Sequence, residues 1–112
     1  MAKFMILYCS STSASDAMAQ STPEQMKASM GEWMVWQEES GKTAKLEWGL
    51  PLQAVGRVTP DGIRVSDCQA SGYATIECDS KDQAMELLKS HPHLKRADAY
   101  IDLLEMIPMP GM

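Results

Sequence analysis

Both histidines of the chain lie in one short segment, His91-Pro92-His93. Histidine has an ordinary pKa of about 6.5, so it exchanges a proton near neutral pH, and it is also a common metal ligand. The segment follows a helical pattern and precedes a strand pattern, which places the imidazoles beyond the end of a helix. For proton transfer or for binding of a transition metal, this segment is the first candidate site.

Three interpretations of these imidazoles are open from the sequence. His91 can cap the helix or bind a backbone carbonyl, as the helix dipole favours. It can instead form an acid–base pair with Asp67 or Asp102 in a pocket, where a carboxylate would orient the ring and raise its basicity. His91 and His93 can also direct both rings to a metal ion, but no local Cys or His cluster supplies further ligands.

The remaining candidate residues are acidic or aromatic. Asp102 interrupts an apolar strand pattern and must face something polar, whereas Trp48 stands beside Gly49 and can line a pocket or pack in the core. We take as candidate catalytic residues His91, Asp67 and Asp102, and as candidate binding residues Trp48, His93, Tyr73 and Trp33.

The composition indicates a single acidic, globular domain spanning residues 1–112. Of the 112 residues, 45% are apolar, which is enough to form a core. The net charge of −5 and the scattered Lys and Arg residues argue against a nucleic-acid partner, and no apolar run is long enough to span a membrane. Three cysteines without a C-x-x-C pair and the lack of a secretory signal pattern favour a cytoplasmic location.

In the first half of the chain, a strand and a helix are expected to position the candidate residues. Residues 3–9 form an apolar run typical of a central strand, and residues 10–21, rich in Ser, Ala and Thr, are expected to be a flexible loop. A capping box at residues 22–25 begins a helix, and Gly41 is expected to end it in a left-handed conformation. Core packing is the favoured role of the Met and Trp stripe of this helix, with a Trp in a pocket wall as the alternative.

The second half of the chain predicts strands, a helix and a tail. Short extended pieces are expected at residues 43–48 and 53–59, and the turn signal Pro60-Asp61-Gly62 predicts a hairpin of residues 53–59 with 63–66. The later elements are a strand at 72–78, a helix that opens at Asp79-Ser80 and ends at or just before His91, a strand at 99–106 and a tail at 107–112.

This order predicts an α+β fold, the ferredoxin-like βαββαβ arrangement, with two helices on one face of an antiparallel sheet. The other face of the sheet would then be open. Because a single open sheet with many apolar residues needs a second layer, we expect a homodimer formed through that face.

Five motifs cover nearly the whole chain, in the order 3–8, 22–24, 49–52, 72–77 and 101–108. In this order and spacing they resemble the YCII-related family. The resemblance implies a dimeric α/β barrel, in which two ferredoxin-like sheets face each other and pockets lie between sheet and helices. It also implies a family with few characterised members, among them small-molecule enzymes such as a dehydrochlorinase that acts on an aromatic ring.

The chain departs from the family pattern at three places. Gln25 occupies the position where many members carry a first-helix histidine, and it cannot act as a base. Residues 65–67 begin like the Asp-Gly-Pro-Phe motif of a major branch but continue as Cys68-Gln69, so that branch's link with sigma-factor-like proteins is not carried over. Where many members have Asp-Pro, this chain has His91-Pro92. If the chain has a site, we expect His91 at this position to supply its ionisable group.

Two functions remain open from the sequence. One is a small acid–base enzyme that acts on an organic or aromatic acid without a cofactor or a metal. The other is a noncatalytic dimer that binds a small molecule or another protein.

Overall fold

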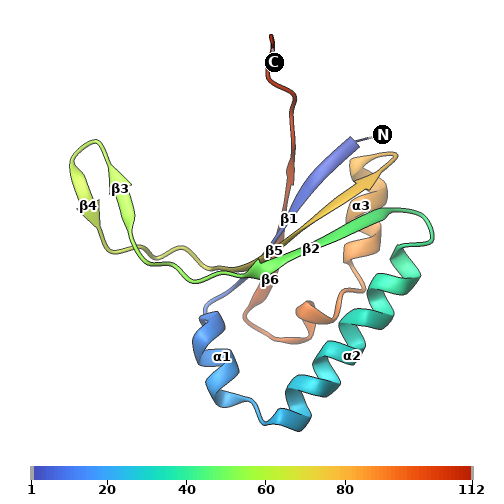
Figure 1. The fold of residues 1–112 in the computed structure, drawn as a ribbon, viewed down its shortest axis with the longest axis horizontal. Coiled ribbons are helices and arrows are strands. Elements are labelled where there is room, and N and C mark those ends of the chain that lie inside the picture. The colour runs from blue at the N-terminus through green and yellow to red at the C-terminus, as the bar shows by residue number, and fades with distance from the viewer. Residues whose placement is uncertain (1, 112) are drawn as a thin grey trace.

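Six strands and three α-helices lie along residues 2–111, the part of the chain that the computed structural model describes (Figure 1). The elements are β1 (Ala2–Ser10), α1 (Ala14–Gln20), α2 (Pro23–Ser40), β2 (Lys45–Pro51), β3 (Arg57–Thr59), β4 (Gly62–Arg64), β5 (Ala70–Cys78), α3 (Lys81–Leu88), the 3₁₀ turn η1 (Pro92–Lys95) and β6 (Ala99–Glu105).

Four strands form one antiparallel sheet in the order β2-β5-β1-β6. The apolar run of β1 lies in the centre, where Ile6 pairs with Ala74 of β5 on one side and with Leu103 of β6 on the other. The predicted α+β class with an antiparallel sheet is therefore confirmed. This strand order is compatible with a ferredoxin-like fold.

The sheet has one face covered by helices, which we call the helix face. Side chains alternate along β1, so Phe4, Ile6 and Tyr8 are buried there together with Trp36 of α2 and Leu88 of α3. A fully buried side chain of this size stabilises the fold by roughly 1.5–3 kcal/mol. The opposite face, which we call the open face, carries the alternate residues Met5, Leu7, Tyr73, Asp102 and Leu104.

Helix α2 begins as predicted and packs differently from the prediction. Thr22 and Gln25 form the capping box, in which each side chain accepts a hydrogen bond from the other's backbone N–H, at 2.9 and 3.1 Å. Gly41 ends the helix in a right-handed conformation, with φ of −65°, so the expected left-handed terminator is wrong. The glycine is useful there because a Cβ would lie 2.9 Å from the carbonyl oxygen of Gln37.

The methionines of α2 do not pack against the sheet, contrary to the favoured role of the stripe. Met26, Met30 and Met34 are exposed, whereas Trp36 is buried and Trp33 is half-buried. Because α2 turns its Trp36 side to the sheet, the methionines lie away from it, between about a quarter and nearly half a turn around the helix.

The expected loop over residues 10–21 is also wrong in part, because residues 14–20 form α1. Ser13 caps this helix by accepting a hydrogen bond from the backbone N–H of Asp16 at 3.1 Å. Asp16 in the first turn complements the helix dipole, and alanine is the best helix former. A composition that indicated a loop therefore also suits a short capped helix.

The predicted hairpin forms, although its strands are shorter than expected. Strands β3 and β4 pair across the turn at Pro60-Asp61, where Thr59 is the partner of Gly62, and the φ of +131° at Gly62 suits a glycine. This hairpin and its connecting residues project from the sheet as an arm, defined here as residues 52–69 (Figure 1). Its Val58, Ile63 and Val65 side chains are exposed.

At the end of the chain, residues 106–109 have no regular structure and lead away from the sheet (Figure 1). The predicted tail at 107–112 agrees with this as far as residue 111, and its last residue lies outside the described residues. None of the helices found between residues 2 and 111 is long and apolar enough to cross a membrane.

Candidate functional site

His91 lies just beyond α3 and begins the turn η1. The backbone before Pro92 is extended, with φ −66° and ψ 134°, so the helix stops before His91 as predicted. The backbone N–H of His91 donates to the carbonyl of Leu88 at 3.1 Å. The ring atom Nδ1 accepts a hydrogen bond from the backbone N–H of His93 at 3.0 Å, so the imidazole caps η1.

This cap fixes the tautomer of His91. Because Nδ1 accepts a hydrogen bond, the proton of the neutral ring must be on Nε2. Nε2 lies 3.1 Å from the hydroxyl oxygen of Tyr8 and therefore donates to it. His91 is only 2% exposed and Tyr8 only 3% exposed, so this pair is buried between the sheet and the helices.

Four more rings surround the pair, and together they form what we call the aromatic cluster. The ring centroid of His91 lies 4.3 Å from that of Trp36 and 4.5 Å from that of Trp33. Trp36 also donates its indole N–H to the carbonyl of Leu87 at 2.9 Å, which ties α2 to α3. Aromatic pairs at such distances contribute about 0.5–1.5 kcal/mol each. The members of the cluster are Tyr8, Trp33, Trp36, Trp48, His91 and His93.

Burial controls the protonation of the cluster. Burial, together with the nearby His93, lowers the pKa of His91 to about 3. Burial also lowers the pKa of His93, although its Nε2 hydrogen bond to the carbonyl of Cys9, at 3.0 Å, acts in the opposite direction. The pKa of Tyr8 is raised well above 10 by burial. All three rings are therefore neutral at pH 7, and His91 is a weak base.

The structure does not bring the two candidate aspartates to His91. Asp67 is exposed at the base of the arm and forms an ion pair with Arg57, which lowers the pKa of the carboxyl. Asp102 is paired with Leu7 in the β1–β6 ladder, so it belongs to the open face, whereas Tyr8 and His91 lie on the helix face. The sheet itself separates Asp102 from the imidazole.

Three of the four candidate binding residues join His91 in the aromatic cluster. Trp33 and His93 are half-buried in it, and Trp48, 39% exposed, lies at its margin. Tyr73 is elsewhere, on the open face, where its ring covers Gly49 so closely that a Cβ on the glycine would lie 2.3 Å from ring atoms.

Sequence reasoning missed Tyr8 and Trp36 as partners of His91. The available signal was the alternation Phe4-x-Ile6-x-Tyr8, which places a hydroxyl at the end of a buried stripe. A buried Tyr needs a hydrogen-bond partner, but alternation alone does not identify which one. Asp98 was missed as well. It accepts hydrogen bonds from the Ser11 and Thr12 hydroxyls at 2.8 and 3.1 Å, which lower the pKa of its carboxyl to about 2.

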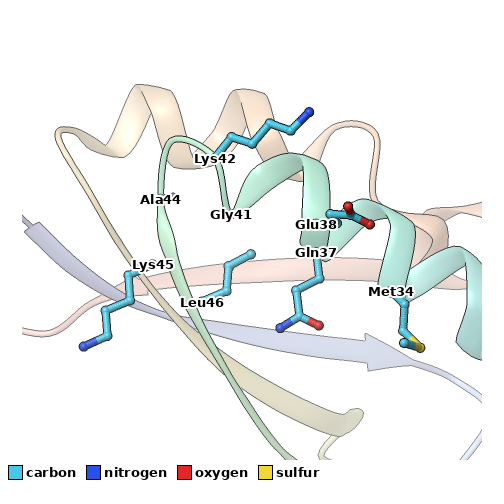
Figure 2. A pocket seen from close by; sticks show the side chains of 8 residues that line it. All are labelled: Met34, Gln37, Glu38, Gly41, Lys42, Ala44, Lys45 and Leu46. Atoms are coloured by element: carbon cyan, nitrogen blue, oxygen red, sulfur yellow. The ribbon is translucent and has the colours of Figure 1, made fainter.

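Two surface hollows lie outside the aromatic cluster. The larger, of about 600 Å³, opens between the end of α2 and β2, and Figure 2 shows the side chains of Gln37 and Met34 extending from the same side of the helix. Leu46 points into the same space, whereas the Lys42 amine points away from it (Figure 2). The second, of about 310 Å³, lies at the base of the arm and includes Asp67 among its lining residues. Neither hollow is lined by an imidazole.

Within residues 2–111, no group of three or more His, Cys, Asp or Glu side chains is arranged to hold a metal ion. When the chain is compared with known proteins, no family model matches it and no curated protein matches it.

Proposed function

We propose that this chain is the subunit of a noncatalytic homodimer of the YCII-related, dimeric α/β-barrel type, in which the open faces of two ferredoxin-like sheets pack together. A small molecule or a second protein would be the ligand of this dimer, and the cytoplasm its location. The observation that carries the proposal is the apolar centre of the open face.

That centre is continuous across three strands. Leu7 of β1 pairs with Tyr73 of β5, and Met5 pairs with Leu104 of β6, so four large side chains adjoin one another. Leu104 is 50% exposed, and α2 and α3 cover only the other face. Contiguous apolar surface of this kind marks interaction sites, and a two-fold pair of identical patches is the commonest way to cover it.

The geometry of His91 supports the noncatalytic part of the proposal. Both ring nitrogens already have partners, Tyr8 and the backbone of His93, and the side chain is buried. A general base must reach the proton that it removes and is most effective with a pKa near the working pH. His91 meets neither condition, whereas capping and packing account for all of its contacts.

Sedimentation velocity at micromolar concentration tests the dimer. We expect the wild-type chain to sediment as a dimer and Leu104→Glu, which places a charge in the centre of the patch, to sediment as a monomer. The matched control is Met34→Glu, a similarly exposed position, 63%, on the flank of α2. A wild-type monomer, or a Leu104→Glu variant that remains dimeric, would refute the proposal.

One observation favours the alternative of an acid–base enzyme acting on a small organic or aromatic acid. Tyr8, His91 and His93 all have shifted pKa values and are in contact, and such groups cluster at functional sites. A substrate would enter beside Trp48, the most exposed ring of the aromatic cluster. This function requires that His91→Asn abolish turnover of an aromatic-acid substrate while the protein stays folded. Turnover that survives in this variant would exclude it.

A further inference from the structure

Two of the three cysteines lie at the same end of the sheet, on neighbouring segments. Cys9 of β1 is the cross-strand partner of Ala70, and the backbone N–H of Ser10 donates to the carbonyl of Gln69 at 3.0 Å. Cys68 comes two residues before Ala70 and is therefore the diagonal neighbour of Cys9. Cys78 pairs with Ala2 at the opposite end of the same ladder, about 23 Å from Cys9 along the strand.

The two thiols differ in accessibility. Cys9 is buried, whereas Cys68 is exposed. Burial raises the pKa of the Cys9 thiol, and the nearby Asp102 carboxylate acts in the same direction, so this thiol keeps its proton. Cys68 is consequently the thiol that meets a reagent first, and Cys9 is the thiol behind it.

The separation of the two residues fits a disulfide after a small movement. Diagonal neighbours in an antiparallel pair have Cα atoms about 7–8 Å apart, and a disulfide spans about 4.4–6.8 Å. Cys68 belongs to a stretch, residues 65–69, that has no regular structure. The stretch can therefore move by about 1–2 Å toward β1 without breaking the sheet.

We propose that Cys9 and Cys68 form an oxidisable dithiol site for low-molecular-weight disulfides such as oxidised glutathione. The Cys68 thiolate attacks one sulfur of the reagent, so a mixed disulfide forms and one reagent thiolate leaves and takes up a proton. Cys9 then attacks Sγ of Cys68, and its proton passes to the departing reagent thiolate, so the second reagent thiol is released. The protein dithiol is thus oxidised by two electrons, and the reagent disulfide is reduced to two thiols.

This bond would fix the base of the arm to the central strand. Residue 68 is the next-to-last residue of the arm, and between residues 52 and 69 only β3 and β4 have regular structure. Oxidation would therefore link a projecting segment covalently to the end of the central strand β1. The inference is independent of the proposed dimer, because both cysteines belong to one chain.

The test uses the full chain with Cys78→Ser, because trypsin leaves Cys68 and Cys78 in one peptide, residues 65–81. Serine can keep the hydrogen bond that the Cys78 thiol donates to the Ser80 carbonyl. After incubation with oxidised glutathione, we expect the loss of both titratable thiols, a mass lower by two hydrogen atoms, and a link between peptides 4–27 and 65–81. The further variant Cys68→Ser should keep its one remaining thiol.

Three results would overturn the proposal. They are a stable glutathione adduct on Cys68 with Cys9 still reduced, a disulfide between two chains on a non-reducing gel, and two thiols that remain reduced. If Cys78→Ser does not fold, the wild-type chain is treated with oxidised glutathione and digested in the same way. Loss of two of its three thiols and the same linked peptides are then expected, and fragmentation of the linked peptide should show Cys78 as the thiol that remains free.

Discussion

The buried, neutral imidazole of His91 makes the stability of this protein depend on pH. Its pKa in the folded chain is about 3, below the ordinary value of 6.5, because burial disfavours the charged ring. The neutral form is therefore the one that the fold accepts. The contribution of His91 to stability is fully present above about pH 6.5 and is lost as the pH falls from there toward 3.

The size of this loss follows from the two pKa values. Below pH 6.5 the unfolded chain takes up the proton while the folded chain still excludes it, at about 1.4 kcal/mol per pH unit. Between pH 7 and pH 4 the loss from this one side chain is therefore about 3 kcal/mol. Domains of this size have a total stability of about 5–15 kcal/mol, so the effect is large enough to measure.

The assay is urea unfolding, followed by far-UV circular dichroism at several pH values between 7 and 4. The variant is His91→Asn, because asparagine does not titrate and its carbonyl oxygen can still accept from the backbone N–H of His93. Asp and Glu residues titrate in both proteins, so the difference between the two pH profiles isolates His91. We expect the wild-type chain to lose about 3 kcal/mol more than the variant.

Parallel pH profiles would refute this reasoning, because they would mean that the folded chain accepts the charged ring at no cost. His93→Asn is the second comparison. Its ring is half-buried and its pKa is also lowered, so its removal should reduce the pH dependence by a smaller amount.

Two substitutions test the packing on the two faces of the sheet. Tyr8→Phe removes the acceptor of the His91 Nε2–H and leaves a buried donor unpaired, so urea unfolding at pH 7 should show a loss of about 1–3 kcal/mol; a loss below about 0.5 kcal/mol would contradict the assigned hydrogen bond. Gly49→Ala places a methyl group against the Tyr73 ring and should cost about 1–3 kcal/mol. The same glycine substitution made in a Tyr73→Ala background should cost much less, and an equal cost in both backgrounds would show that the ring is not the obstacle.

Local signals in the sequence predicted most of the elements, although not α1. Two such signals are the capping box at Thr22 and Gln25 and the turn before Gly62. Each depends on interactions among residues only a few positions apart, so it forms independently of the rest of the fold. The apolar run of β1 also indicated a central strand correctly. Such patterns indicate the type and order of the secondary-structure elements, which is why the fold class could be predicted.

The arrangement of the candidate site could not be predicted in the same way. Asp102 and Tyr8 lie on opposite faces of the sheet because of the β1–β6 register, in which Asp102 pairs with Leu7. A shift of one residue would reverse the faces, and no single-strand pattern determines this register. Helix α2 presents a similar problem, since its Met and Trp residues form one wide apolar band and only packing decides which part is buried.

The aromatic cluster also determines which movements of this protein can be detected by intrinsic tryptophan fluorescence. All three tryptophans of the chain belong to it, and the ring centroid of Trp48 lies 5.4 Å from that of Trp33 and 6.4 Å from that of Trp36. Intrinsic fluorescence therefore comes from one small volume where α2 meets the sheet. The arm and the tail contain no tryptophan, so their movements give no direct signal in emission, whereas a local opening beside His91 changes the whole spectrum.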